Sequence, residues 1–116
     1  MSSKPHSQAQ TLKQRASVFA ALGDQTRLKV LARLSSGESQ SIARLTAGSR
    51  LSRQAMTKHL GVLARAGIVR STRVGRESLF RLEPQPIVEA RSYLEQVSAL
   101  WDDALARLKL HVESGE

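Results

Sequence analysis

The spacing of apolar residues changes after Gly67 in this 116-residue chain, and that change limits the folds open to it. Before Gly67, apolar side chains recur every three or four residues, as they do along one face of a helix. Met56, Leu60 and Leu63 form such a stripe. After Gly67, two runs rich in β-favouring residues surround "VGRE" and predict a hairpin.

The expected elements follow a definite order. Four helices, two strands and a long helix are expected at about 10–22, 25–35, 40–47, 52–66, 68–73, 78–82 and 87–112. Gly23 ends the first helix, and Asp24 and Ser52 are good N-caps for the second and fourth. The segment "EPQP" is expected to be a rigid spacer between the hairpin and the long helix.

The third and fourth helices are joined by the short turn "GSRLS", as in a helix–turn–helix, here over about 40–66. The hairpin over about 68–82 then forms a wing. The sequence therefore predicts a mainly α winged helix–turn–helix domain over 9–116. The polar residues 1–8 predict a disordered tail.

Basic residues are concentrated in the middle of the chain. The formal net charge is +8 and the isoelectric point is about 11.1. Residues 41–82 alone carry +8, whereas 1–40 carry +4 and 83–116 carry −4. A localised basic excess is typical of proteins that bind the phosphate backbone of nucleic acids.

Several function classes are disfavoured by what the chain lacks. There is no Cys, which removes disulfides, thiolate metal sites and thiol redox sensing. No nucleophile–His–acid set, Gly-rich phosphate loop or HExxH motif is present, so an enzyme is not expected. No run approaches the roughly 18 apolar residues of a membrane span, and "MSSKPHSQAQ" has no apolar core, so a cytoplasmic protein is expected.

The outward face of the 52–66 helix carries side chains suited to reading DNA. Arg53 can bind guanine, Gln54 adenine, and the Thr57 methyl group can meet thymine, while Lys58 can reach phosphate. Ser52 is expected to cap the helix first and to contact phosphate second. A solvated helix face is the alternative interpretation.

The tip of the hairpin supplies the other candidate DNA contacts. Gly75 suits a turn at positive φ, and Arg73 and Arg76 are expected to bind phosphate or enter the minor groove. In the 52–66 helix, His59 is expected to be half-buried, hydrogen-bonded and structural. Gly61 fits either a close approach to DNA or an ordinary surface position.

The segments "VFAALGDQTRLKVLARL", "SIARL", "LSRQAMTKHLGVLARAGIV" and "RVGRESLFRL" occur in this order over roughly residues 16–82. Together they resemble the ArsR/SmtB family of bacterial transcriptional repressors. The resemblance implies double-stranded operator DNA as the partner. The tail "YLEQVSALWDDALARLKLHV" is similar to the dimerisation helix of a branch without known metal ligands.

The chain departs from the metal-sensing members of that family. Where they carry Cys-x-Cys, this chain has "SIARLTAGSR". On its last helix, Asp102 and Asp103 are adjacent, and His111 and Glu113 lie two residues apart, so neither pair shares a face. No metal and no cofactor is expected, although a sensor of a metal or an organic ligand at the dimer helices stays an alternative.

A heptad-like apolar seam runs from Ile87 to Leu108 and is wider than one small hairpin could cover. This predicts a homodimer formed through the first and last helices. The expected interface residues are Leu12, Phe19, Leu94, Val97, Trp101, Leu105 and Leu108.

These observations predict a sequence-specific, dimeric DNA-binding regulator, in particular a repressor that binds a palindromic operator through residues 52–66 and 73–76. A non-specific architectural DNA-binding protein and a protein–protein adaptor that uses the long helix are the alternatives. The sequence names no operator, regulated gene or small-molecule effector.

Overall fold

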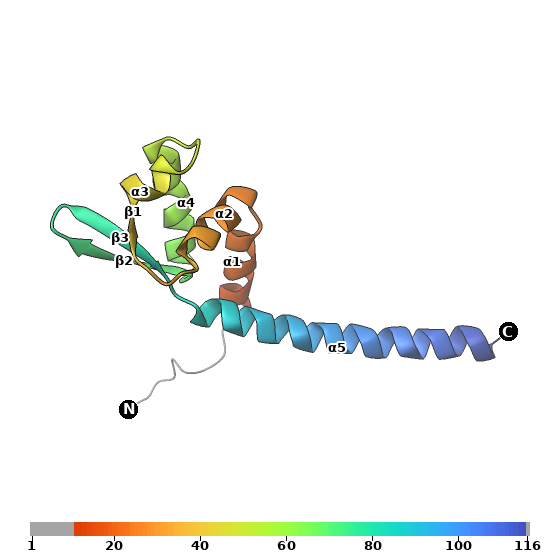
Figure 1. The fold of residues 1–116 in the computed structure, drawn as a ribbon. Helices are drawn as coiled ribbons and strands as arrows, with labels where there is room; N and C mark the ends of the chain where they lie inside the picture. The colour runs from red at the N-terminus through yellow and green to blue at the C-terminus, as the bar shows by residue number, and fades with distance from the viewer. Residues whose placement is uncertain (1–10, 116) are drawn as a thin grey trace, which may run out of the picture.

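The computed structural model describes residues 11–115, so the tail expected at 1–8 lies outside the described residues. The elements in chain order are α1 Leu12–Leu22, α2 Gln25–Leu34, β1 Gln40–Ser41, α3 Ile42–Ala47, α4 Arg53–Arg65, β2 Val69–Val74, β3 Glu77–Leu82 and α5 Gln85–Ser114. Figure 1 shows the short helices α1–α4 gathered together, the β2–β3 hairpin projecting on one side and α5 extending on the other. The predicted winged helix–turn–helix order is confirmed.

Side-chain caps fix where the helices begin. The Oγ1 atom of Thr11 accepts a hydrogen bond from the Gln14 amide at 3.1 Å, and the Thr11 amide donates to Gln14 Oε1 at 2.8 Å. This reciprocal capping box starts α1 at Leu12, two residues later than expected. Asp24 and Ser52 cap α2 and α4, as the sequence predicted.

The wing belongs to a sheet of three antiparallel strands in the order β1-β3-β2, and not to an isolated hairpin. Residues 40 and 41, expected to begin the third helix, instead form β1 and pair with Phe80 and Leu79 of β3. Ser41 explains the error, because it is the N-cap of α3 and holds the extended backbone of that position, with φ −77° and ψ 162°. Because the backbone at this N-cap is already extended and lies beside the edge of β3, it can pair with β3 as a strand.

The spacer expected at "EPQP" is only partly a spacer. Pro84 occupies the N-cap position of α5, and Gln85 and Pro86 already lie in its first turn. Proline is tolerated there because the first amides of a helix have no partner within the helix. The helix continues to Ser114, so its 30 residues span about 45 Å at 1.5 Å per residue.

The core lies where the four short helices meet the base of the sheet and the first turns of α5. It is formed by Val18, Ala21, Val30, Leu31, Leu34, Leu45, Met56, Leu60, Leu63, Ile68, Val69, Phe80 and Ala90. The predicted α4 stripe of Met56, Leu60 and Leu63 is at most 1% exposed. Over residues 11–115, no helix combines the length and apolar character needed to cross a bilayer.

Candidate nucleic-acid interface

The orientation of α4 is fixed at both of its ends. The Ser52 hydroxyl accepts the Ala55 amide at 3.1 Å and starts the helix. At the other end, Gly67 has φ +80°, and the Ile68 amide donates to the Leu63 carbonyl at 2.9 Å. This is the hydrogen bond of a glycine-based helix stop, and it leads the chain directly into β2. With its apolar stripe buried, α4 presents one set of side chains outward.

The outward set contains the residues expected to read DNA. Arg53, Gln54, Thr57 and Lys58 are all exposed in the first turns of α4. Their spacing of one, three and four residues places them on adjoining parts of the same helix surface. The Thr57 hydroxyl donates to the Arg53 carbonyl at 2.8 Å, which leaves its methyl group as the group available to an outside partner.

His59 is half-buried and bonded to another helix, as the sequence predicted. Its Nδ1 lies 3.3 Å from Arg27 Nη1. The same guanidinium donates to the carbonyls of Ala21 at 2.7 Å and Ala20 at 3.2 Å. Arg27 therefore links the end of α1 and the start of α2 to the middle of α4. The backbone amide of Arg27 also lowers the pKa of Asp24, against the opposing effect of desolvation.

The wing ends in a tight turn that carries two cations. Val74 pairs with Glu77, so Gly75 and Arg76 form a two-residue loop. Gly75 has φ +62°, a conformation that glycine adopts without steric cost and that suits the first position of a type II′ turn. Arg73 Nε donates to the Gly75 carbonyl at 3.4 Å, so its guanidinium bends toward the tip beside the exposed Arg76.

Comparison of the sequence and structure with known proteins identifies the family of this chain. A model described as a helix-turn-helix domain matches residues 15–72. The solved structure of an ArsR-like transcriptional regulator from Rhodococcus sp. RHA1 is 41% identical in sequence, covers 88% of this chain and 95% of its own, and gives a TM-score of 0.76. The chain belongs to the ArsR family of transcriptional regulators.

Two further structures resemble this ArsR-family regulator. A possible transcriptional regulator for arsenical resistance is 32% identical, with 86% of this chain and 96% of that chain covered and a TM-score of 0.62. A homodimeric winged helix-turn-helix DNA-binding domain from Mycobacterium bovis gives a TM-score of 0.63, with 85% and 91% covered, and at 20% identity it supports the fold alone. A search among curated proteins found no significant match.

The family settles two of the predictions. The resemblance to ArsR repressors is confirmed as membership of the ArsR family, whose solved members here are transcriptional regulators. A regulator with a DNA-binding fold, and not an enzyme, is therefore the established class of this protein.

Metal sensing is not supported by a cluster of ligands. Across residues 11–115, no three His, Cys, Asp or Glu side chains gather closely enough to hold an ion. On α5, Asp103 is hydrogen-bonded to Arg107 at 3.0 Å, as an ordinary surface pair one helical turn apart. The sequence-based expectation of no metal site stays a prediction.

Sequence reasoning missed Arg33, which closes the first helix of the helix–turn–helix. Its guanidinium donates to the Leu45 carbonyl at 2.5 Å and to the Arg44 carbonyl at 3.0 Å. It also lies against Gly48, where an added Cβ would stand 2.6 Å from Arg33 Nη1. Arg33 thus holds the end of α3 against α2. Its partners are 11 and 12 residues away, so no local motif indicates the contact.

Proposed function

We propose that this ArsR-family regulator is a homodimeric repressor that binds a specific palindromic operator through α4 and the wing and does not respond to metal ions. The observation that carries the proposal is the outward face of α4. Arg53 and Gln54 extend from a helix whose two ends are fixed by hydrogen bonds, so their donors and acceptors can discriminate base edges. The wing adds Arg73 and Arg76, which suit phosphate or the minor groove.

The dimer is supported by the apolar surface that a single chain leaves exposed. Leu12 of α1 is 72% exposed and Trp101 of α5 is 63% exposed. The same face of α5 exposes Leu94, Leu105 and Leu108, and Figure 1 shows the distal half of α5 clear of the other elements. A second copy offers an identical apolar face, which a twofold axis would bring into contact.

The remaining predicted interface residues mark where the pairing would begin. The Phe19 ring lies 6.2 Å from Tyr93 between ring centroids, so α1 already packs against α5 within one chain. Val97, one turn further along, is half-buried. The proposed interface continues outward from this contact along α5.

Selection from a pool of randomised duplexes tests the operator directly. We expect the full-length protein to enrich a twofold-symmetric sequence whose half-sites lie about one helical turn apart, because a twofold axis relates the two α4 helices. A pool that stays random while still binding at low salt would indicate a non-specific architectural protein. A pool that does not bind at all would favour an adaptor that acts through α5.

Metal titration tests the last part of the proposal. Stoichiometric Zn(II), Ni(II) or As(III) is expected to change affinity for the selected operator by less than about twofold, since no set of ligands at proper spacing is present among the described residues. Tenfold release would show that Asp103, His111 or Glu113 had been wrongly dismissed.

A further inference from the structure

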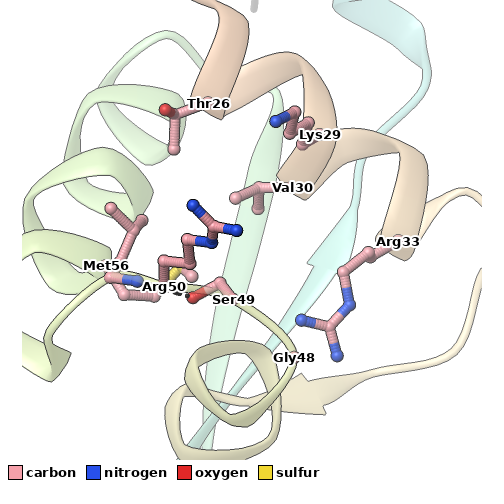
Figure 2. Close-up of a pocket in the computed structure, with 9 residues that line it drawn as sticks. Thr26, Lys29, Val30, Arg33, Gly48, Ser49, Arg50 and Met56 are labelled. Carbon is pink, nitrogen blue, oxygen red and sulfur yellow. Dashed lines mark hydrogen bonds between the residues drawn. The ribbon is translucent and has the colours of Figure 1, made fainter.

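A cavity of about 290 Å³ lies between α2 and the turn that joins α3 to α4. Its walls are formed by Thr26, Lys29, Val30, Arg33, Gly48, Ser49, Arg50, Leu51 and Met56. Figure 2 shows the Arg50 side chain reaching from the turn across the cavity toward Val30 of α2. The cavity thus joins an element of the core to the connection inside the helix–turn–helix.

The lining of this cavity is apolar at the bottom and basic at the rim. Val30 and Met56 are 3% and 1% exposed and form an apolar floor. The rim carries the cations Lys29, Arg33 and Arg50, and no carboxylate is among the lining residues. An apolar floor with a few convergent polar groups is the usual composition of a small-molecule site.

The three cations are not equally available. Arg33 is occupied by the carbonyls at the end of α3. The side chains of Lys29 and Arg50 have neither an ion pair nor a hydrogen bond within the part of the chain that the structure describes. Two cations facing one apolar floor with no neutralising acid form a site complementary to an anion with an apolar body.

We propose that this cavity binds a small organic monocarboxylate, with its carboxylate on Lys29 and Arg50 and its apolar part on Val30 and Met56. Charge-assisted hydrogen bonds of this kind are stronger than neutral ones, and arginine suits carboxylate geometry. The volume lies just below the roughly 300–1,000 Å³ of drug-sized ligand pockets, so the ligand is a small acid.

The position of the site gives binding a consequence for DNA, a step that rests on the proposed function. Arg50 lies three residues before Arg53, and Met56 lies on α4 itself. A bound carboxylate neutralises positive charge beside the start of α4 and so weakens the attraction of that region for phosphate. The ligand therefore lowers DNA affinity, and by linkage DNA lowers ligand affinity by the same factor.

Binding is tested without DNA by amide NMR of the full-length protein. The probes are benzoate, phenylacetate and hexanoate, with benzamide as the neutral control, at constant ionic strength. We expect at least one acid to give saturable shifts at Gly48, Ser49 and Leu51, and benzamide to give none. Shifts that are absent, unsaturable or equal for benzamide overturn the proposal.

Two matched variants locate the site. Arg50→Ala and Lys29→Ala are each expected to weaken carboxylate binding about tenfold, because each removes a charge-assisted contact. Lys13→Ala removes the same charge from an exposed position on α1 outside the cavity and should leave binding unchanged. Equal loss in all three variants would mean non-specific anion attraction and overturn the proposal.

The DNA arm separates this proposal from the proposed function. The acid that binds is added to the complex of the protein with the selected duplex, and it replaces an equal concentration of chloride so that the ionic strength stays constant. The affinity of the protein for the duplex is expected to fall about tenfold. If Arg50→Ala weakens DNA binding but no acid gives saturable shifts, the cavity serves a DNA phosphate and the carboxylate proposal fails while the repressor proposal stands. If acids bind but no duplex is selected, the repressor proposal fails alone.

Discussion

At the scale of residues, the proposed DNA contacts fall into two kinds that differ in what they can distinguish. Arg53 and Gln54 on α4 can pair with base edges, which differ from step to step. Arg76 at the tip of the wing can meet phosphate, which is the same at every step. Substitutions at the two places should therefore differ in kind as well as in size.

Arg53→Ala or Gln54→Ala is expected to cost about 1–3 kcal/mol on the selected operator and to relax preference at one base position. Arg76→Ala should weaken all sequences alike and reduce the slope of log affinity against log salt by about one. A salt series on each variant, against operator and scrambled duplex, measures both effects. If Arg53→Ala and Gln54→Ala lowered the affinity for operator and scrambled duplex equally, α4 would attract DNA only through its charge and would not read base sequence.

Gly61 offers a second test at this scale. It lies inside α4, and an added Cβ would meet only the mobile end of the exposed Arg65 side chain, at 3.4 Å. Gly61→Ala should therefore raise the free energy of unfolding by about 1 kcal/mol, as alanine does in helix interiors. Urea denaturation measures that gain. Unchanged operator affinity in this variant would assign Gly61 to an ordinary surface position, and a large loss would assign it to close contact with DNA.

At the scale of elements, local rules predicted more of the fold than non-local ones. Asp24, Ser52 and the Met56 stripe act within one or two turns, so the sequence identified them. The capping box at Thr11 follows a local pattern too, threonine and glutamine three residues apart, but it was not predicted, and the first helix was expected to begin at about residue 10. The strand β1 was not predicted either, since it exists through pairing with β3, some 40 residues later.

Arg33 shows how a non-local contact shapes the helix–turn–helix. Arg33→Ala would leave the Leu45 and Arg44 carbonyls without that donor, and should lower the free energy of unfolding by about 1–3 kcal/mol. Arg44→Ala is the matched control, because the exposed Arg44 contributes its backbone carbonyl and not its side chain, and should stay within about 0.5 kcal/mol. Equal stability of the two variants would show that α3 is held by its apolar contacts alone.

At the scale of the whole molecule, charge and apolar surface are divided between its two ends. The basic segment 41–82 forms the helix–turn–helix and the wing, while the segment from residue 83 onward carries a net charge of −4 and most of the exposed apolar surface. The sequence predicted this division, because it depends on composition and helical spacing. The sequence could not show how much of α5 extends beyond the core, because that depends on where the contact between α1 and α5 ends.

The proposed dimer forms through α5, whereas the proposed DNA contacts lie on α4 and the wing. Binding of a two-half-site operator should therefore depend on the dimer, and Trp101 tests this dependence. Trp101→Glu places a charge in the apolar face of α5, and burying an unpaired charge between two subunits is costly. We expect light scattering to show a monomer at micromolar concentration. Because Trp101 is 63% exposed in the single chain, the variant should keep its helical circular dichroism.

Operator affinity of the same variant should fall sharply, since two half-sites must be held at once, whereas its affinity for scrambled duplex should fall much less. Leu28→Glu is a matched control: Leu28 is 50% exposed on α2, whereas the proposed interface is formed by α1 and α5, so the same new charge there should leave the dimer intact. A folded wild-type monomer at micromolar concentration would contradict the dimer outright. A monomeric Trp101→Glu variant that still bound the full operator with wild-type affinity would show that one subunit suffices for recognition.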